Sequence, residues 1–330
     1  MRDLLRPVVV APMAGGPSTP ELVVAAARAG ALGFLAAGYK TPEAVEAEVR
    51  AVRGSNFRYG LNLFVPSPPP AAPQAIERYR AALRPEAERY GVELPPVRLT
   101  DDDHFAAKLE IAVEHRVPVV SFTFGVPPAD AVRALRAAGS AVLITVTTAD
   151  EARQALAADP DGLIAQGGDA GGHSSTFRPA TYRGDRTARE VLAEVRSVTG
   201  LPVVAAGGGD VPGLLAAGAA AVQCGTAFLL ADEAGTRPAQ RAAMLSGDYP
   251  ETVVTRAFTG QPARALRNRF VAAYSPIAPL GYPAVHHLTA PIRAAAARLS
   301  DPEALNLWAG TGHASVHPAP VAALLDRLRA

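Results

Sequence analysis

Cysteine and long apolar runs are scarce in this sequence. Cys224 is the single cysteine, which excludes an internal disulfide and a cysteine-based zinc or iron–sulfur site, and favours a reducing, cytoplasmic compartment. No stretch approaches the roughly 18 to 20 uninterrupted apolar residues of a membrane span, so no membrane association is expected. The apolar run from Val8 to Val10 ends at Pro12, too soon for the core of a signal peptide, and indicates a first strand.

An excess of charge of one sign is also missing. Thirty-two Lys and Arg stand against 31 Asp and Glu, a net charge of +1, with no long basic block. A nucleic-acid partner is therefore not expected, because binding to a phosphate backbone depends on clustered cations. Apolar residues fill 49% of the 330 positions, enough to exclude intrinsic disorder. This length corresponds to one large barrel or to two ordinary domains.

Short runs rich in Val, Ile, Leu and Phe recur along the chain, and most are followed by a stretch rich in Ala, Arg and Glu. This alternation is typical of parallel strands joined by crossover helices. The pattern predicts eight strands, at 8–13, 31–38, 59–65, 118–125, 141–146, 162–166, 202–207 and 220–226.

Helix signals lie in the connections between these strands. Thr19, Thr41 and Thr148 are candidate N-caps that precede proline or acidic residues. Eight strand-then-helix units over about 225 residues predict a (β/α)8 TIM barrel, an α/β fold. An open doubly wound sheet is the alternative, although no unit carries the Rossmann glycine pattern at its first turn.

Two segments interrupt the repeat. Residues 66–100 hold five prolines between 66 and 73, then a predicted helix at 74–90, so we expect a Pro-rich insertion after strand 3 that serves as a lid or as a contact surface. From residue 229 onward the strand repeat stops, and the remaining residues predict a helical C-terminal lobe over the barrel mouth. The expected division is a barrel at 1–228 and a lobe at 229–330.

The active site of such a barrel is built from the carboxyl ends of its strands. Two neighbouring strands end in glycine-rich turns, at Gly207-Gly208-Gly209 and at Gly225-Thr226. Bare backbone N–H groups beside a helix N-terminus predict a phosphate site there. A purely structural turn is the alternative, because tight turns need glycine for steric reasons.

The loop after strand 6 is the most informative segment. It reads Gln-Gly-Gly-Asp-Ala-Gly-Gly-His from Gln166 to His173, so the backbone can approach a flat ligand and one imidazole stands at the rim. Histidine exchanges a proton near neutral pH, which makes His173 the candidate acid or base, with a packed structural histidine as the alternative. The other six histidines are expected to be packed or surface residues, and an N-cap with first-turn acids explains the cluster at 101–104.

Amide side chains also stand at strand ends. Asn62 and Gln166 can donate to and accept from the polar edge of a heterocycle. The alternative is that each caps loop backbone. No metal site is expected, because no His, Asp and Glu group has ligand spacing at the strand ends, and Cys224 has no partner base for nucleophilic catalysis.

Taken together along the chain, the segments at the strand ends resemble those of the nitronate monooxygenase family, formerly called 2-nitropropane dioxygenases, in its class I branch. The segments that carry the resemblance are Ala11-Pro12-Met13-Ala14-Gly15, residues 29–33, Asn62-Leu63-Phe64, residues 121–125, Gln166 to His173, residues 205–208, residues 223–228, residues 267–270 and Trp308-Ala309-Gly310. The Ala-Gly-Gly-His motif is specific when it occurs in order with the others. One departure is Ser174-Ser175, where the family often has Arg-Gly.

The resemblance implies a barrel that binds FMN non-covalently and uses O2 to convert alkyl nitronates, such as propionate 3-nitronate, to carbonyl compounds and nitrite. By the same resemblance His173 is the active-site histidine, which takes a proton from a nitroalkane or, once protonated, holds the nitronate oxygens. The residues implied at the cofactor are Pro12, Met13, Ala14, Gly171 and Gly172 at the flavin ring, Asn62 and Gln166 at its polar edge, Gly207, Gly208, Gly225 and Thr226 at the phosphate, and Gln223 also in the cofactor site.

Two alternatives to this function stay open. An NAD(P)H-dependent flavin reductase of the same scaffold, acting on quinones or enoyl-ACP, is the enzyme alternative, although no nicotinamide fingerprint is visible. A non-catalytic flavin-binding protein is the third class. The expected partners are a small anionic nitronate and O2, and the chain is compatible with a homo-oligomer.

Overall fold

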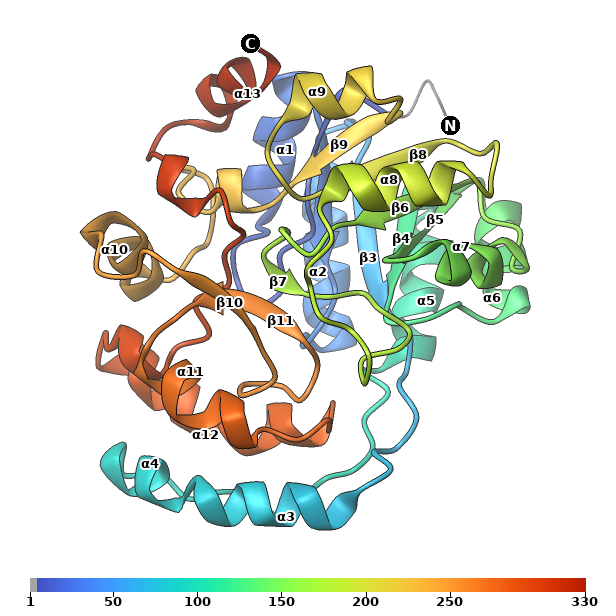
Figure 1. Ribbon diagram of the computed structural model, residues 1–330. Coiled ribbons are helices and arrows are strands. Elements are labelled where there is room, and N and C mark those ends of the chain that lie inside the picture. Colours follow the sequence, from blue (N-terminus) through green and yellow to red (C-terminus); the bar gives the residue numbers. More distant parts are fainter. Residues whose placement is uncertain (1–4) are drawn as a thin grey trace.

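The computed structural model describes residues 5–330. Within them, eight parallel strands close into a barrel in the order β1-β2-β3-β4-β5-β6-β8-β9 (Figure 1). They are β1 (Val8–Val10), β2 (Leu32–Ala36), β3 (Gly60–Phe64), β4 (Val119–Thr123), β5 (Ala141–Val146), β6 (Gly162–Gln166), β8 (Val203–Ala206) and β9 (Ala221–Cys224). Each strand lies inside its predicted range. The predicted TIM barrel is confirmed, and the open sheet is excluded because β1 pairs with β9.

Apolar side chains fill the interior of the barrel. The interior cluster is Leu5, Val9, Leu32, Phe34, Val119, Leu143, Ile164, Val204, Ala206 and Ala221. The fit is tight at Phe34, because a Cβ atom added to Gly60 on the next strand would overlap its ring. A filled interior directs ligands to the rim formed by the carboxyl ends of the strands.

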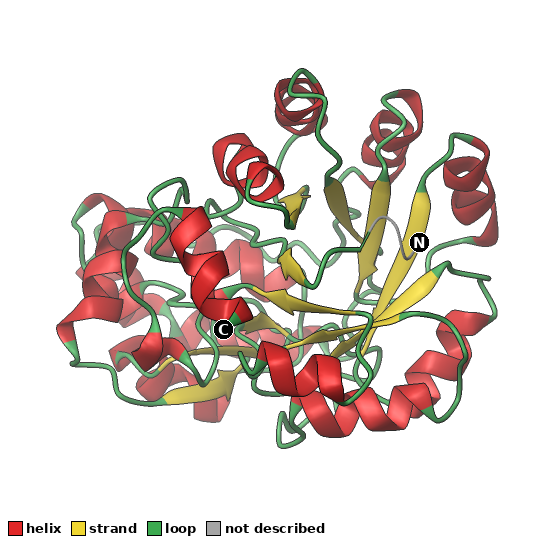
Figure 2. Ribbon diagram, turned by 90° about the horizontal axis from the view of Figure 1, so that it is seen from above, coloured by secondary structure: helices red, strands yellow, loops and turns green. Residues whose placement is uncertain are grey.

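Eight helices of the described chain surround the strands (Figure 2). They are α1 (Pro20–Arg28), α2 (Pro42–Arg53), α5 (Phe105–Glu114), α6 (Ala129–Ala137), α7 (Ala149–Leu156), α8 (Ala188–Arg196), α9 (Val211–Ala216) and α13 (Val321–Arg329). The side chains of Thr19, Thr41 and Thr148 accept hydrogen bonds from backbone N–H groups at the starts of α1, α2 and α7, as predicted. In residues 5–330 we find no helix with the length and hydropathy needed to cross a membrane.

The segment between β9 and α13 packs around an apolar cluster of its own, which includes Phe258, Phe270 and Leu288. It contains α10 (Pro238–Ser246), α11 (Arg269–Tyr274), α12 (Ala284–Arg298), β10 (Thr252–Thr255) and β11 (Ala263–Leu266). β10 pairs with β11, which pairs with β7 (Gly172–His173) from the barrel loop.

The sequence had indicated a helical lobe, but the lobe also contains the two strands β10 and β11. Its two strands are four residues long and are completed by pairing with a distant loop, so local pattern does not reveal them. The division at 228/229 stays a prediction, and α13, which lies beyond it, packs against α1, α9 and β1.

The insertion after β3 forms α3 (Pro73–Ala82) and α4 (Arg84–Arg89), which lie along α12 (Figure 1). Ile76, Tyr79 and Leu83 are buried in the apolar cluster of the lobe. The Tyr79 hydroxyl donates to the carbonyl oxygen of Ala257 at 2.7 Å. This packing makes the insertion part of the lobe's core and does not fit a freely moving lid.

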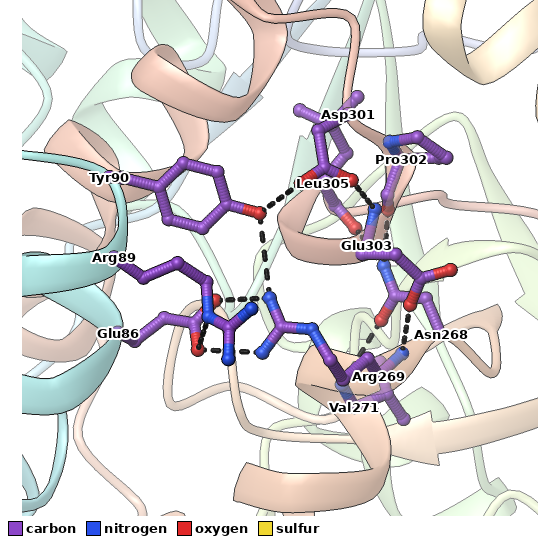
Figure 3. Close-up of polar contacts among 10 residues, drawn as sticks. All are labelled: Glu86, Arg89, Tyr90, Asn268, Arg269, Val271, Asp301, Pro302, Glu303 and Leu305. Atoms are coloured by element: carbon purple, nitrogen blue, oxygen red, sulfur yellow. Dashed lines mark hydrogen bonds and ion pairs between the residues drawn. The ribbon is translucent and has the colours of Figure 1, made fainter.

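A charged network ties α4 to the lobe (Figure 3). Arg269 donates from Nη1 and Nη2 to the two carboxylate oxygens of Glu86, at 2.7 and 2.5 Å. Beside this pair, the Tyr90 hydroxyl donates to Oδ2 of Asp301 at 2.6 Å. The Glu86 side chain is only 4% exposed, so the bidentate pair with Arg269 is what makes its burial tolerable.

We predict that Glu86→Gln lowers the free energy of unfolding by about 2 kcal/mol, because one partner of a buried ion pair is lost. The effect stays below the roughly 3–5 kcal/mol of fully buried pairs, since the Arg269 side chain is 34% exposed. Denaturant titration measures the change.

Glu251→Gln is the matched control for this variant. Its pair with Arg267 lies in the same lobe, with side chains 63% and 55% exposed, and its removal is expected to change stability by less than about 0.5 kcal/mol. Equal losses in the two variants would contradict the anchoring role of Glu86.

Candidate functional site

A cavity of about 410 Å³ lies at the carboxyl ends of the barrel strands. Its volume is within the roughly 300–1,000 Å³ of small-molecule sites. All thirteen residues singled out from the sequence line it: Pro12, Met13, Ala14, Asn62, Gln166, Gly171, Gly172, His173, Gly207, Gly208, Gln223, Gly225 and Thr226. The fold thus brings the predicted residues together, while the ligand atoms that each contacts stay a prediction.

The glycine turn after β8 forms one end of the cavity. Gly207, Gly208 and Gly209 have φ angles of 113°, 79° and 74°, in the left-handed region that other residues rarely adopt. Across from this turn, after β9, Thr226 Oγ1 accepts a hydrogen bond from the Gly310 N–H at 2.9 Å. Bare, outward-turned backbone at two neighbouring strand ends fits the phosphate group of a cofactor.

Asp169 stands beside this turn, and the sequence reasoning gave it no role. It is the one acidic residue among the described residues that line the cavity. Its Oδ2 accepts from the Ala188 N–H at 3.2 Å, whereas its Oδ1 is buried without a hydrogen-bond partner among residues 5–330. Burial raises the pKa of the Asp169 carboxyl above its ordinary value. A Cβ atom added to Gly208 would lie 2.9 Å from Asp169 Oδ2, so a side chain at this position requires the Asp169 carboxylate to shift.

Two amides face the cavity with open hydrogen-bonding groups. Asn62 Oδ1 accepts from Ser121 Oγ at 2.8 Å and from Thr123 Oγ1 at 3.0 Å, which leaves its Nδ2 as a donor. Gln223 Oε1 is buried without a partner in the described chain, which leaves it as an acceptor. One donor and one acceptor fit the polar edge of a flavin ring.

The Gln166 side chain, in contrast, forms hydrogen bonds within the protein at both its nitrogen and its oxygen. Its Nε2 donates to the carbonyl oxygen of His173 at 3.0 Å, and its Oε1 accepts from the Ser175 N–H at 2.7 Å. The capping alternative therefore holds for Gln166, because its carboxamide fixes the loop that carries His173.

Glu151 anchors the other end of that loop, and the sequence pointed to it only as an acid in a first helical turn. Its carboxylate accepts from the N–H and hydroxyl of Thr147, at 2.7 and 2.8 Å, and from Thr176 Oγ1 and the Phe177 N–H, both at 2.7 Å. Four donors around a buried carboxylate satisfy its acceptors and hold the loop rigid.

His173 lies in a cage of aromatic rings. Its ring centroid is 5.3 Å from Trp308, 5.6 Å from Phe124, 6.3 Å from Tyr282 and 6.4 Å from Tyr39. Phe124 and Trp308 belong to segments of the family resemblance, but sequence reasoning did not predict that these rings surround His173. Its rings come from two strand ends and from the lobe, and a linear pattern does not reveal such long-range contacts.

The hydrogen bonds of His173 assign its tautomer. Its Nε2 lies 2.9 Å from Thr259 Oγ1, and the Thr259 hydroxyl donates in turn to the carbonyl oxygen of Gln261 at 3.3 Å. The hydroxyl is then an acceptor toward the imidazole, so the proton is on Nε2 and Nδ1 keeps its lone pair.

Burial, with a smaller effect of Arg293, lowers the pKa of His173 to about 3. The sequence had indicated a histidine that titrates near neutral pH without tuning. The surrounding rings instead disfavour the imidazolium, so the imidazole is neutral at physiological pH. A neutral ring does not hold an anion by its charge, and the low pKa also makes His173 a weak base.

His286 is a packed histidine, as expected, and it stacks on the cavity-lining Tyr39 at 4.1 Å with an interplanar angle of 6°. The expected N-cap at 101–104 is wrong. The cluster at 101–104 is not a side-chain cap, because His104 is the N-cap residue and makes no capping bond. Asp103 instead accepts from the Tyr39 N–H at 2.9 Å. Residues 5–330 contain no group of three His, Cys, Asp or Glu side chains placed to hold a metal ion.

Comparison with known proteins decides the family of this barrel. The profile described as nitronate monooxygenase matches residues 1–330. The chain belongs to the nitronate monooxygenase family. It is 35% identical to a "Probable nitronate monooxygenase" of Staphylococcus aureus (strain Newman), over 97% of this chain and 92% of that protein.

Solved structures agree with this membership. Nitroalkane oxidase from Streptomyces ansochromogenes is 44% identical, with a TM-score of 0.94 over 99% of this chain and 96% of that one. FabK from Thermotoga maritima, 24% identical with a TM-score of 0.75 over 99% and 92% of the two chains, shares the fold. The predictions of family and of a flavin-dependent oxidoreductase are confirmed. The cytoplasmic compartment and the homo-oligomer stay predictions.

Cys224 lies in β9 beside the cavity. The thiol is buried in β9, and burial raises its pKa to about 12. It packs as a small apolar residue, as the sequence indicated.

We predict that His173 makes the protein less stable in mild acid. The pKa of His173 is about 3 in the folded state and about 6.5 in the unfolded chain, so the unfolded chain binds one more proton between these values. Stability therefore falls as pH drops below about 6.5. Between pH 7 and pH 5 the free energy of unfolding of the wild type is expected to fall by about 2 kcal/mol through His173. His173→Asn is expected to lack this contribution.

Denaturant titrations of both proteins at pH 7 and pH 5 measure this difference. His104→Asn is the control, because His104 is an exposed histidine and its removal should leave the acid dependence of the wild type in place. If His173→Asn loses as much stability as the wild type, the imidazole is freely protonated in the fold and the assignment of a neutral ring is wrong.

Proposed function

We propose that this protein uses bound FMN to oxidise alkyl nitronates with O2 to carbonyl compounds and nitrite. The observation that carries the proposal is the cage of aromatic rings around His173, at a cavity lined by glycine turns and by the open amides of Asn62 and Gln223. The cage suits a small, planar ligand, whereas a bulky hydride donor needs an open face. The nitroalkane oxidase of known structure supports the same substrate class.

The residues of the cavity fit FMN. Asn62 Nδ2 and Gln223 Oε1 would meet the polar edge of the ring, and Met13 would contact its face. Gly207, Gly208 and Thr226 would hold one phosphate, which suits a mononucleotide better than a dinucleotide. When bound, the flavin supplies the electron-transfer and O2 chemistry, and the protein supplies position and electrostatics.

His173 would accept a proton at Nδ1 when the substrate arrives as a neutral nitroalkane. The lowered pKa of His173 disfavours that transfer, because the imidazolium would form among apolar rings. A nitronate has already lost this proton and needs no base. We therefore infer that the preformed nitronate is the better substrate, with the imidazole ring as one wall of its pocket, because an unprotonated Nδ1 has no hydrogen to donate to a nitronate oxygen.

The choice of electron donor tests the proposed function. Under anaerobic conditions, propionate 3-nitronate is expected to bleach the flavin absorbance rapidly, and NADH or NADPH slowly or not at all. Stopped-flow absorbance measures both rates. Fast bleaching by NADH with no response to the nitronate would overturn the proposal and select the quinone or enoyl-ACP reductase alternative.

The position of the phosphate gives a second test. The purified protein is expected to be yellow and to release FMN, not FAD, on denaturation. Gly208→Asp should bind no FMN, because it adds a negative charge where a phosphate is expected and lies against Asp169. Gly208→Ala is the control for the strain at this left-handed position, and should keep more FMN than the Asp variant. Normal FMN content in Gly208→Asp would place the phosphate elsewhere.

A further inference from the structure

Tyr39 follows β2 in a backbone conformation that a bulky residue seldom adopts. Its φ angle is 69°, in the left-handed region, where strain of this kind persists only when the surroundings enforce it. The enforcing contact is the hydrogen bond from the Tyr39 N–H to Oδ1 of Asp103 at 2.9 Å. Asp103 Oδ2 in turn lies 2.8 Å from Nζ of Lys108, whose side chain is 1% exposed. A buried ion pair thus holds Tyr39 at this strand end.

The ring of Tyr39 is fixed as firmly as its backbone. It stacks on His286 at 4.1 Å and meets Phe64 edge-on at 5.4 Å. It lines the cavity, and its centroid lies 6.4 Å from that of His173. Tyr39 and His173 therefore share one part of the cavity.

The Tyr39 hydroxyl is buried and has no well-aligned hydrogen-bond partner among residues 5–330, although the Tyr282 side chain lies beside it. A buried hydroxyl without a partner is costly, and native proteins rarely keep one without use. Burial raises the pKa of the Tyr39 hydroxyl above its ordinary value, so the group stays protonated and is available as a donor. Tyr39 lines the cavity, and its hydroxyl hydrogen is not committed to a protein acceptor.

Positive charge lies behind this donor. Arg293 is 8% exposed, and its guanidinium contacts only the Thr289 hydroxyl and the carbonyl oxygen and ring of His286. No carboxylate pairs with it in the described part of the chain. A buried cation without a counter-charge favours an anion nearby. Arg293 contacts His286, and His286 stacks on Tyr39, which lines the cavity.

We propose that Tyr39 is a substrate-binding residue, whose hydroxyl donates a hydrogen bond to a nitronate oxygen held beside His173. The inference rests on the proposed function and deepens it. A protonated phenol binds an oxyanion more strongly than a neutral oxygen, so Tyr39 favours the nitronate over the neutral nitroalkane. Arg293 acts through His286 and Tyr39 as a positioning residue.

Tyr39→Phe tests the proposal, with Tyr59→Phe as a matched control. The Tyr59 hydroxyl is also buried without a partner in residues 5–330, but Tyr59 does not line the cavity. Neither variant loses a protein hydrogen bond, so we expect both to keep the wild-type Tm and FMN content. For ethyl nitronate, kcat/KM should fall about 10- to 100-fold in Tyr39→Phe and stay within about twofold in Tyr59→Phe.

The other outcomes separate this inference from the proposed function. Wild-type kcat/KM in Tyr39→Phe, with an active wild type, would overturn the inference and leave the function standing. A lower Tm or a loss of FMN in Tyr39→Phe alone would assign the hydroxyl to the fold or to the cofactor, and would also overturn it. A wild type that turns over no nitronate would instead overturn the proposed function.

Discussion

The pairing of β1 with β9 is the contact on which the site depends. It closes the sheet by setting Val8, Val9 and Val10 against Val222, Gln223 and Cys224. Closure brings the carboxyl ends of all eight strands to one rim, so residues from the start of the chain stand beside residues more than 200 positions later. An open sheet with the same strands would leave Met13 and Gln223 at opposite edges, and the cavity they share would not exist.

The polar groups of this region fall into two kinds. Those that hold the loops are satisfied: Glu151 accepts four hydrogen bonds and Gln166 makes two. Those that line the cavity keep an open atom, namely Gln223 Oε1, Asp169 Oδ1 and the Tyr39 hydroxyl. Rigid loops with unused hydrogen-bonding groups are a preorganised site, because a ligand can meet these atoms without first breaking protein contacts.

How much the sequence predicts depends on whether the signal is local. Strand periodicity and threonine caps are local, and they predicted the barrel and its connections. His173 was found because glycines mark its loop. Tyr39 stands at the end of a predicted strand, but its stacking on His286 of the lobe is a long-range contact that no linear pattern records, and the pKa of His173 was misjudged for the same reason. Gln166 has the residue type of a ligand-binding amide, and only its hydrogen bonds show that it holds a loop.

The position of α13 bears on how the protein folds as it is made. This helix packs on β1 and α1, and its Val321, Leu324 and Leu325 are buried in the outer core of the barrel. Yet it is synthesised after the whole lobe, long after its partners have left the ribosome. The apolar surface of β1 and α1 that α13 covers therefore stays exposed until the end of translation, and transiently exposed apolar surface of this kind promotes aggregation.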